Sequence, residues 1–226
     1  MAERSQTDAG SACALRPGVA VLVIATCTLA FAYLASHVST TGALAALDLQ
    51  IARWLHANAS PALVTAMFWV SNAQGIAGIS VLSLLMGAFL ARKREWNWLL
   101  VLILSVAGGM LLNVLLKETI RRPRPMFDDP LLTLATWSFP SGHTAGATAF
   151  YGVVAAYLTS NTMSRRRRTL VIASAITLLV LVAFSRMVLG AHYLSDVLAA
   201  FVSSTGWLAL CFAVVGLWGR HRLTRA

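Results

Sequence analysis

The stretch Lys117-Glu118-Thr119-Ile120-Arg121-Arg122-Pro123-Arg124-Pro125 lies among long apolar segments of this 226-residue chain. Charged groups beside membrane-type sequence are costly, and they usually face one another or a cavity. A second polar cluster runs from Ser138 to His143, and a third from Ser185 to Asp196. We therefore expect the three clusters to form one site at the rim of a helical membrane bundle.

The composition is that of an integral membrane protein. Hydrophobic residues make up 58% of the chain and charged residues 12%, whereas a soluble domain has about 25% charged residues. Helices satisfy their own backbone hydrogen bonds in lipid, and the sequence therefore predicts an all-α bundle. Cys13, Cys27 and Cys211 have no spacing typical of a disulfide framework or a zinc site.

Six apolar segments have roughly the 20 residues that a spanning helix needs. Between the first two, residues 44–58 show helical spacing of apolar positions and carry Trp54, which suits the aromatic belt of a membrane. We expect a short interfacial helix there, with a plain connecting loop as the alternative. The expected spans cover residues 17–36, 63–91, 98–116, 143–158, 170–188 and 194–218.

Two of these spans have unusual features. Residues 17–36 have a second interpretation as a secretory signal, because Ala32 to Ala35 resembles a cleavage site. The apolar core of a signal is usually about 7–15 residues long, and the greater length here favours an uncleaved span. The second span is interrupted by Ser71-Asn72-Ala73-Gln74-Gly75.

The basic residues orient the expected bundle. With the N-terminus inside, the tails 1–16 and 220–226 and the loops at 92–94 and 165–168 hold twelve of the 18 basic residues, as the positive-inside rule requires. The sequence therefore predicts cytoplasmic termini around a six-span domain, residues 17–219, whose site faces the exterior. This placement explains the net charge of +10 without nucleic-acid binding.

The cations of the three clusters are expected at this outer level. Lys117 ends the third span, Arg124 follows it, and Arg186 lies near the end of the fifth. Guanidinium forks match phosphate oxygens bidentately, and a lysine adds a compact charge. Ser141 and Gly142 open a helix whose free N–H groups favour the same anion. These residue types predict a phosphate site.

Two histidines at the same level suggest acid–base and nucleophilic chemistry. His192 and Asp196 are four residues apart and share one helix face. Asp196 can accept from one ring nitrogen and leave the other as the nucleophile, while His143 on the facing helix can protonate the leaving oxygen. A lone histidine at a membrane rim is more often an interfacial polar residue than a catalyst. A His–Asp pair at this spacing is equally typical of either role, and the stretch from Arg121 to Pro125 suits a lipid-headgroup anchor equally well. Their coincidence favours catalysis.

The motifs resemble a known signature. Six residues separate Lys117 from Arg124-Pro125, Pro140 to His143 follows, and Ser185-Arg186 precedes His192 and Asp196. This order and spacing are similar to the three-part signature of the type-2 phosphatidate phosphatase, or lipid phosphate phosphatase, superfamily, which also includes vanadium haloperoxidases.

The resemblance implies a metal-independent hydrolysis that needs no cofactor. In it, His192 forms a phosphohistidine with support from Asp196, and His143 acts first as acid and then as base. The residues implied to hold the phosphoryl oxygens are Lys117, Arg124, Ser141, Gly142 and Arg186.

The resemblance also implies a multi-pass enzyme of the bacterial inner membrane, with its site facing the periplasm. Its substrate would be a lipid phosphate such as undecaprenyl diphosphate, phosphatidate, phosphatidylglycerol phosphate or a lipid A phosphate. A phosphotransferase on the same scaffold is one alternative. A transporter is another, favoured only by the interruption at residues 71–75. The oligomeric state and the roles of Arg121 and Arg122 stay open, although contact with a lipid headgroup is plausible for both arginines.

Overall fold

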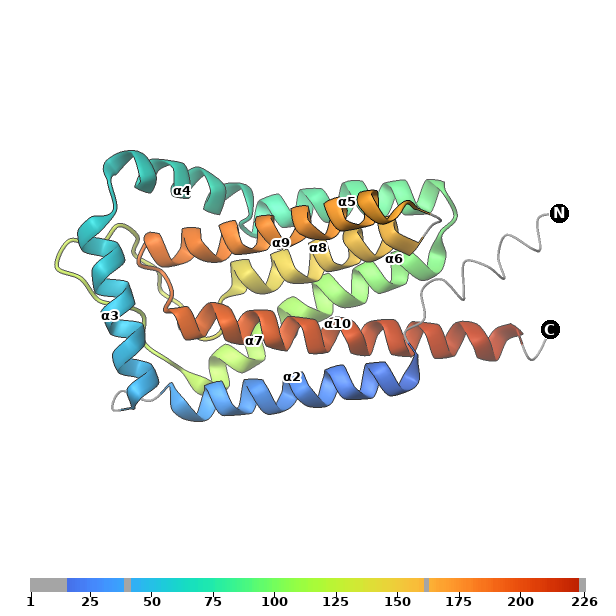
Figure 1. Ribbon diagram of the computed structural model, residues 1–226, viewed down its shortest axis with the longest axis horizontal. Helices are drawn as coiled ribbons and strands as arrows, with labels where there is room; N and C mark the ends of the chain where they lie inside the picture. The colour runs from blue at the N-terminus through green and yellow to red at the C-terminus, as the bar shows by residue number, and fades with distance from the viewer. Residues whose placement is uncertain (1–15, 39–41, 161–162, 224–226) are drawn as a thin grey trace.

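A computed structural model describes residues 16–38, 42–160 and 163–223, and every regular element in these ranges is helical. The predicted all-α fold is therefore confirmed (Figure 1). Most of the expected N-terminal tail, Cys13, and the last residues of the basic C-terminal tail lie outside the described residues. The helices are α2 (Pro17–His37), α3 (Ala43–Asn58), α4 (Pro61–Ala73), α5 (Ile76–Arg92), α6 (Trp96–Ile103), the π-helical turn η1 (Leu104–Gly108), α7 (Gly109–Ile120), α8 (Gly142–Ser160), α9 (Arg165–Val188) and α10 (Leu194–Leu223).

Within the part of the chain that the structure describes, four helical segments are long and apolar enough to cross a membrane individually. They are α2, the continuous run from α6 to α7, α9, and α10 as far as Gly219. Helices α4 and α5 meet the same criterion only as a pair, bent by 46° at their junction. The structure thus supports four spans, or five with the bent pair, and the six-span prediction is confirmed only to that extent.

The remaining expected span, residues 143–158, is helix α8 in the middle of the bundle. It contacts α5, α6, α7, α9 and α10, and a run of its residues from Thr144 to Phe150 is buried. Most of that run is Ala, Gly and Thr, small residues that let neighbouring helices approach closely. The same small and polar residues lower the hydropathy of α8, which is why α8 is not among the helices apolar enough to cross a membrane individually.

The predicted interruption of the second span is present. Helix α4 ends at Ala73 and α5 begins at Ile76, and the Gln74 N–H donates to both Val70 and Ser71 carbonyls. A Cβ added at Gly75 would lie 3.6 Å from Nε2 of His143. The break therefore brings backbone directly beside one of the predicted catalytic imidazoles.

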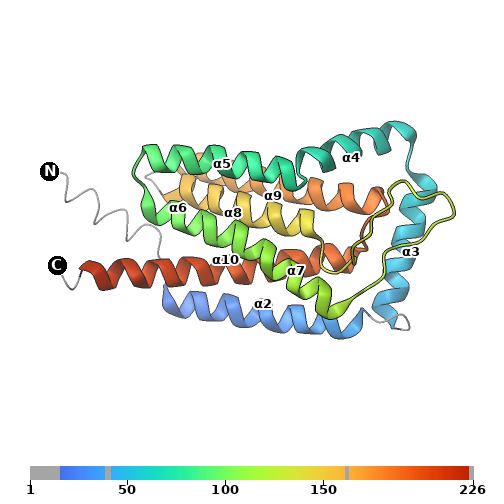
Figure 2. The same cartoon turned by 180° about the vertical axis from the view of Figure 1, so that it is seen from behind.

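Helix α3 lies across one end of the bundle, roughly perpendicular to the other helices (Figures 1 and 2). Its buried residues, Asp48, Ala52 and Leu55, follow helical spacing and form one face, which packs toward α9 and α10. Trp54 on the other side is 63% exposed. The helix predicted at residues 44–58 is confirmed, while its location in a membrane interface stays a prediction.

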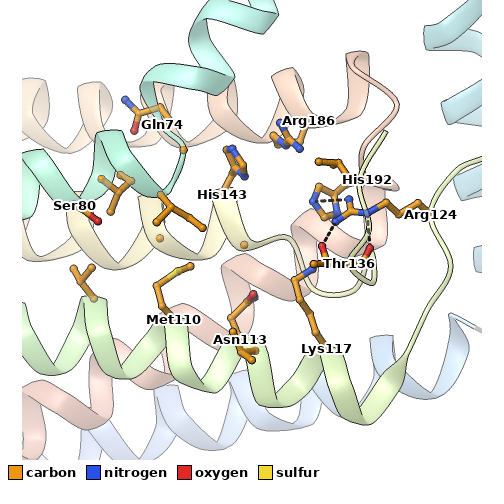
Figure 3. A pocket seen from close by; sticks show the side chains of 18 residues that line it. Gln74, Ser80, Met110, Asn113, Lys117, Arg124, Thr136, His143, Arg186 and His192 are labelled. Atoms are coloured by element: carbon orange, nitrogen blue, oxygen red, sulfur yellow. Dashed lines mark hydrogen bonds between the residues drawn. The ribbon is translucent and has the colours of Figure 1, made fainter. Parts of the chain in front are cut away.

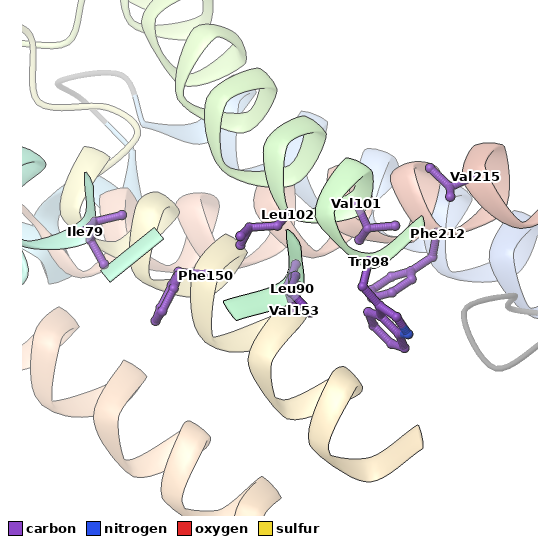
Figure 4. Close-up of a cluster of buried hydrophobic side chains, with 9 residues drawn as sticks. All are labelled: Ile79, Leu90, Trp98, Val101, Leu102, Phe150, Val153, Phe212 and Val215. Carbon is purple, nitrogen blue, oxygen red and sulfur yellow. The ribbon is translucent and has the colours of Figure 1, made fainter. Parts of the chain in front are cut away.

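A cluster of buried hydrophobic side chains packs between helices of the bundle (Figure 4). Trp98 contacts Tyr157 and Phe212 edge-on, with ring centroids 5.3 and 5.8 Å apart. Such edge-to-face pairs add about 0.5–1.5 kcal/mol beyond area burial. The buried members come from α5, α6, α8 and α10: Ile79, Leu90, Trp98, Val101, Leu102, Phe150, Val153, Phe212 and Val215.

The two ends of the bundle differ in their charged residues. The end opposite α3 carries the basic turn at residues 92–94 and the arginines at 165–168 that begin α9. The end beside α3 carries the long connection between α7 and α8 (Figure 2). All three polar clusters of the sequence lie at this second end.

Candidate active site

A cavity of about 340 Å³ opens between α5, α7, α8 and the α7–α8 connection. Figure 3 shows cationic and imidazole side chains pointing into it from segments far apart in the sequence. Six of the eight predicted site residues line this cavity: Lys117, Arg124, Gly142, His143, Arg186 and His192. The convergence expected from the topology is therefore present.

The cations are held mainly by neutral oxygens. Lys117, in the last turn of α7, donates from Nζ to the Trp137 carbonyl at 2.6 Å. Arg124 donates from Nε to the Thr136 carbonyl at 2.7 Å and from Nη1 to the Ala191 carbonyl at 2.6 Å. Because these partners carry no formal charge, both cations keep their positive charge available to an anion in the cavity.

Arg186, in the last turn of α9, is the third cation that lines the cavity. Its Nη1 donates to the Ser71 hydroxyl on α4, and its buried Nε has no hydrogen-bond partner. A buried donor without a partner is costly, and an oxyanion in the cavity would satisfy it. The arrangement favours an anion that accepts from several donors at once.

His192 presents one ring nitrogen to the cavity. Its Nε2 lies 3.4 Å from Nη1 of Arg124, and its Nδ1 lies 3.4 Å from Oδ2 of Asp196. The second contact is an ion-pair distance without hydrogen-bond geometry, because Nδ1 has no hydrogen-bond partner. Burial lowers the pKa of His192 to about 4, although Asp196 opposes the shift. The imidazole is therefore neutral at pH 7 and able to act as a nucleophile.

Two predicted residues lie behind the cavity wall instead of lining it. The carboxylate of Asp196 is fully buried and accepts from the Tyr193 N–H at 2.9 Å. Ser141 is also fully buried; its hydroxyl accepts from the Thr144 hydroxyl at 3.1 Å, and its N–H donates to the Asp196 carbonyl at 3.1 Å. Both residues hold the segments that carry His192 and His143 together.

Several lining residues were not predicted. Gln74 sits at the α4–α5 break, Asn113 lies one helical turn before Lys117, and Thr136 is in the α7–α8 connection. The i to i+4 spacing from Asn113 to Lys117 was a usable signal. Gln74 lies in the interruption that the sequence showed, but its side chain has no motif around it. Nothing in the local sequence marks Thr136.

The two arginines whose roles stayed open are in different environments. Arg121 ends α7 with a left-handed φ of 51° and is exposed, and its Nε donates to the Glu118 carbonyl. Arg122 is only 7% exposed and pairs with two carboxylates. The plausible contact of Arg122 with a lipid headgroup is therefore not what the structure shows.

The fold and the cavity together define a membrane-type helical protein with a cavity lined by three cationic side chains and two imidazoles. Comparison with known families agrees with this class, because the model of the PAP2 superfamily matches residues 98–220. The match covers more than half of the chain and all three motifs, and the chain belongs to the PAP2 superfamily. The resemblance found in the sequence is confirmed.

Two curated relatives are similar to part of this chain. Phosphatidylglycerophosphatase B of Bacillus subtilis (strain 168) is 40% identical over 132 residues, which is 58% of this chain and 62% of the relative. A lipid A 1-phosphatase of Rhizobium etli is 34% identical over 151 residues, 63% of this chain and 60% of the relative. The matched part of the chain thus spans about three fifths of the length of these relatives.

Solved structures support the same architecture over more of the chain. The first transmembrane PAP2-type phosphatidylglycerolphosphate phosphatase structure from Bacillus subtilis superposes with a TM-score of 0.75 at 30% identity, covering 88% of this chain and 96% of that one. Aquifex aeolicus LpxE superposes with a TM-score of 0.54 at 23% identity, covering 77% of this chain and 95% of that one. The second match shows the shared fold alone.

Proposed function

We propose that this protein is a metal-independent lipid phosphate phosphatase that works through a phosphohistidine on His192. The observation that carries the proposal is the single cavity lined by Lys117, Arg124, Arg186 and two histidines. Three cations that keep their charge form a site for a phosphoryl group, whose charge grows in the transition state. A neutral imidazole at its edge supplies the nucleophile.

The geometry suggests the order of bond changes. Nε2 of His192 attacks phosphorus, the P–N bond forms, and the bond to the leaving oxygen breaks as His143, which starts this step in its protonated form, gives that oxygen its proton. Water then attacks the phosphohistidine, His143 takes the proton of the water, and the P–N bond breaks to release inorganic phosphate. Asp196, 3.4 Å from Nδ1, stabilises the positive charge that the ring acquires in the first step.

Among the described residues, no group of three or more His, Cys, Asp or Glu side chains could hold a metal ion. The proposed steps use cationic side chains, two imidazoles and the carboxylate of Asp196, and none of them needs a metal ion. Phosphate release should therefore persist in excess EDTA. Loss of activity that added Mg²⁺ or Zn²⁺ restores would contradict this mechanism.

The cavity favours a phosphomonoester whose leaving group is uncharged. Figure 3 shows Lys117 and Arg124 on the His192 side, whereas Gln74 and Met110 lie beyond His143. Among the described lining residues, those beyond His143 are neutral or apolar. A diphosphate would place its second phosphate there without a cation to pair with.

Phosphatidylglycerol phosphate is the substrate type that we propose first, because the Bacillus subtilis relatives are named for it; its leaving group, phosphatidylglycerol, keeps one phosphodiester charge. Phosphatidate is the next choice, and its leaving group, diacylglycerol, is the uncharged alcohol that the cavity favours. Undecaprenyl diphosphate is the least favoured of the three. The oligomeric state plays no part in the proposal.

We also propose that α8 spans the membrane, which completes the six spans, and that the cavity opens at the exterior surface. The basic residues at 92–94 and 165–168 lie at the opposite end of the bundle, where the positive-inside rule places the cytoplasm. The proposed setting is the bacterial inner membrane, with both termini in the cytoplasm. Cysteine labelling of single-cysteine variants in intact and permeabilised cells would test this orientation.

The function is tested by phosphate release from a panel of lipid phosphates in detergent, with no acceptor lipid present. We expect release from phosphatidylglycerol phosphate and phosphatidate. Release only after an acceptor lipid is added would favour a phosphotransferase. No turnover of any lipid phosphate by folded protein would overturn the proposal.

A further inference from the structure

Arg122 lies between two buried carboxylates. Its Nη1 donates to Oδ1 of Asp196 at 2.6 Å, and its Nη2 donates to Oδ2 of Asp48 at 2.8 Å. Both carboxylates are fully buried, and the Arg122 guanidinium lies over the Tyr193 ring, 4.2 Å from its centroid. The guanidinium fork thus joins the carboxylate behind His192 to a second carboxylate that the sequence motifs do not contain.

Asp48 comes from α3, the helix that crosses the end of the bundle. Its Oδ1 accepts from the Ser195 N–H at 2.9 Å, and its Oδ2 accepts from the Ser195 hydroxyl. Ser195 also accepts from Nη1 of Arg122 at 2.7 Å. Asp48 therefore caps the first turn of α10, where a negative charge is favourable, and it fixes the turn that carries Asp196.

The charges in this network leave one negative charge uncompensated. Arg122 paired with Asp196 alone would form a neutral pair, and the carboxylate would then attract the His192 ring only weakly. Because Asp48 shares the positive charge of Arg122, Asp196 keeps more of its own charge. Electrostatic interactions of this kind are strong in a buried, low-dielectric site.

We propose that Asp48 and Arg122 are positioning residues for His192, acting through Asp196 to stabilise the positive charge that its ring acquires. This inference rests on the proposed phosphatase function. During the first step Nε2 becomes bonded to phosphorus, and the ring, with its proton on Nδ1, becomes cationic. Oδ2 of Asp196 faces that nitrogen, while Arg122 holds Oδ1. Neither Asp48 nor Arg122 lines the cavity, and they affect the chemical step instead of substrate binding.

The first variant is Asp48→Asn, which keeps an oxygen for the Ser195 N–H but removes the charge. We expect kcat, and the single-turnover rate of phosphohistidine formation, to fall roughly tenfold or more, the size expected from loss of one nearby buried charge. KM should change little, whereas the thermal unfolding midpoint should fall, because Arg122 loses one of its two buried charge partners. The matched control is Asp128→Asn, at an exposed position of the α7–α8 connection, which should match the wild type.

The second variant is Arg122→Lys, which keeps the charge but cannot bridge two carboxylates with a fork. Its matched control is Arg121→Lys, the exposed neighbour. We expect Arg122→Lys to lower kcat at an unchanged KM and Arg121→Lys to have no effect. If Asp48→Asn is poorly folded, the kcat of Arg122→Lys decides the question.

The outcomes separate the two proposals. If wild-type protein releases phosphate, His192→Ala does not, and both network variants keep the kcat of their controls, the positioning role is wrong and the phosphatase function stands. A loss confined to KM or to the unfolding midpoint would equally overturn the positioning role. If His192→Ala is as active as the wild type, the proposed function itself fails.

Discussion

Two arginines that are two residues apart in the sequence, Arg122 and Arg124, are in opposite electrostatic situations. Arg124 donates to backbone carbonyls and faces the cavity. Arg122 is buried and held by the carboxylates of Asp48 and Asp196. A cation whose partners are neutral can bind an anion, whereas a cation paired with carboxylates organises the structure. The partners of a charge, more than its place in a motif, indicate its role.

The largest effect is expected at His192, whose ring lies between Arg124 of the cavity and Asp196, the partner of Arg122. Replacement by Ala removes the proposed nucleophile, and phosphate release should fall by about 10³-fold or more. Phosphate release and trapping of the phosphoenzyme measure this directly. His37→Ala, at an exposed position of α2, is the control and should retain activity. Comparable activity in the two variants would remove the central element of the mechanism.

The next largest effect should distinguish the cavity cations from other basic residues. Arg124→Gln removes a fork beside Nε2 of His192, and kcat/KM should fall about 10²- to 10³-fold, as for loss of one oxyanion donor. Arg121→Gln, which keeps a polar side chain at the same left-handed backbone position, should change kcat/KM by less than about twofold. Equal effects would show that the basic stretch acts only through its total charge.

The pH profile tests the burial of His192. Its folded pKa is lowered to about 4, while the unfolded value is about 6.5. The nucleophile is neutral above the folded pKa, and the acid limb of kcat/KM attributable to His192 should lie near pH 4. Because only the unfolded state takes up this proton between these values, burial of His192 should also lower the free energy of unfolding as pH falls from about 6.5 to about 4.

That profile is measured with a soluble phosphomonoester and with unfolding midpoints in detergent across the same pH range. An acid limb centred near pH 6.5 would mean that burial does not lower the pKa of His192 in the working enzyme, either because water reaches the ring or because Asp196 offsets the effect of burial.

The smallest effect concerns the leaving-group side of the cavity. Gln74→Lys places a cation beyond His143, and the ratio of diphosphate to monoester turnover should rise several-fold, a modest gain typical of one partly solvated charge pair. Gln50→Lys, at an exposed position of α3, adds the same charge elsewhere and serves as the control. An unchanged ratio would show that the neutral wall of the cavity does not select the substrate.

Much of the architecture was predictable because membrane helices follow from local composition. The apolar segments gave α2, α9 and α10 close to their observed bounds, and the interruption at residues 71–75 is a real helix break. Helix α8 is the exception, because it is not apolar enough to be recognised as a span by itself. Its Ala, Gly and Thr residues are suited to helix contacts, and only its neighbours in the bundle explain them.

The sequence by itself determined the chemical types of the site, because the motif spacing placed three cations and two imidazoles at the same end of the helical bundle. Tertiary structure decided which charges are available. Asp48 reaches Arg122 across 74 residues of sequence, and Gln74 enters the cavity through a bend between two helices. Such contacts depend on the three-dimensional packing of α3 and α4 against the bundle. Local patterns of charge and hydropathy do not encode the pairing of a buried carboxylate with one particular arginine.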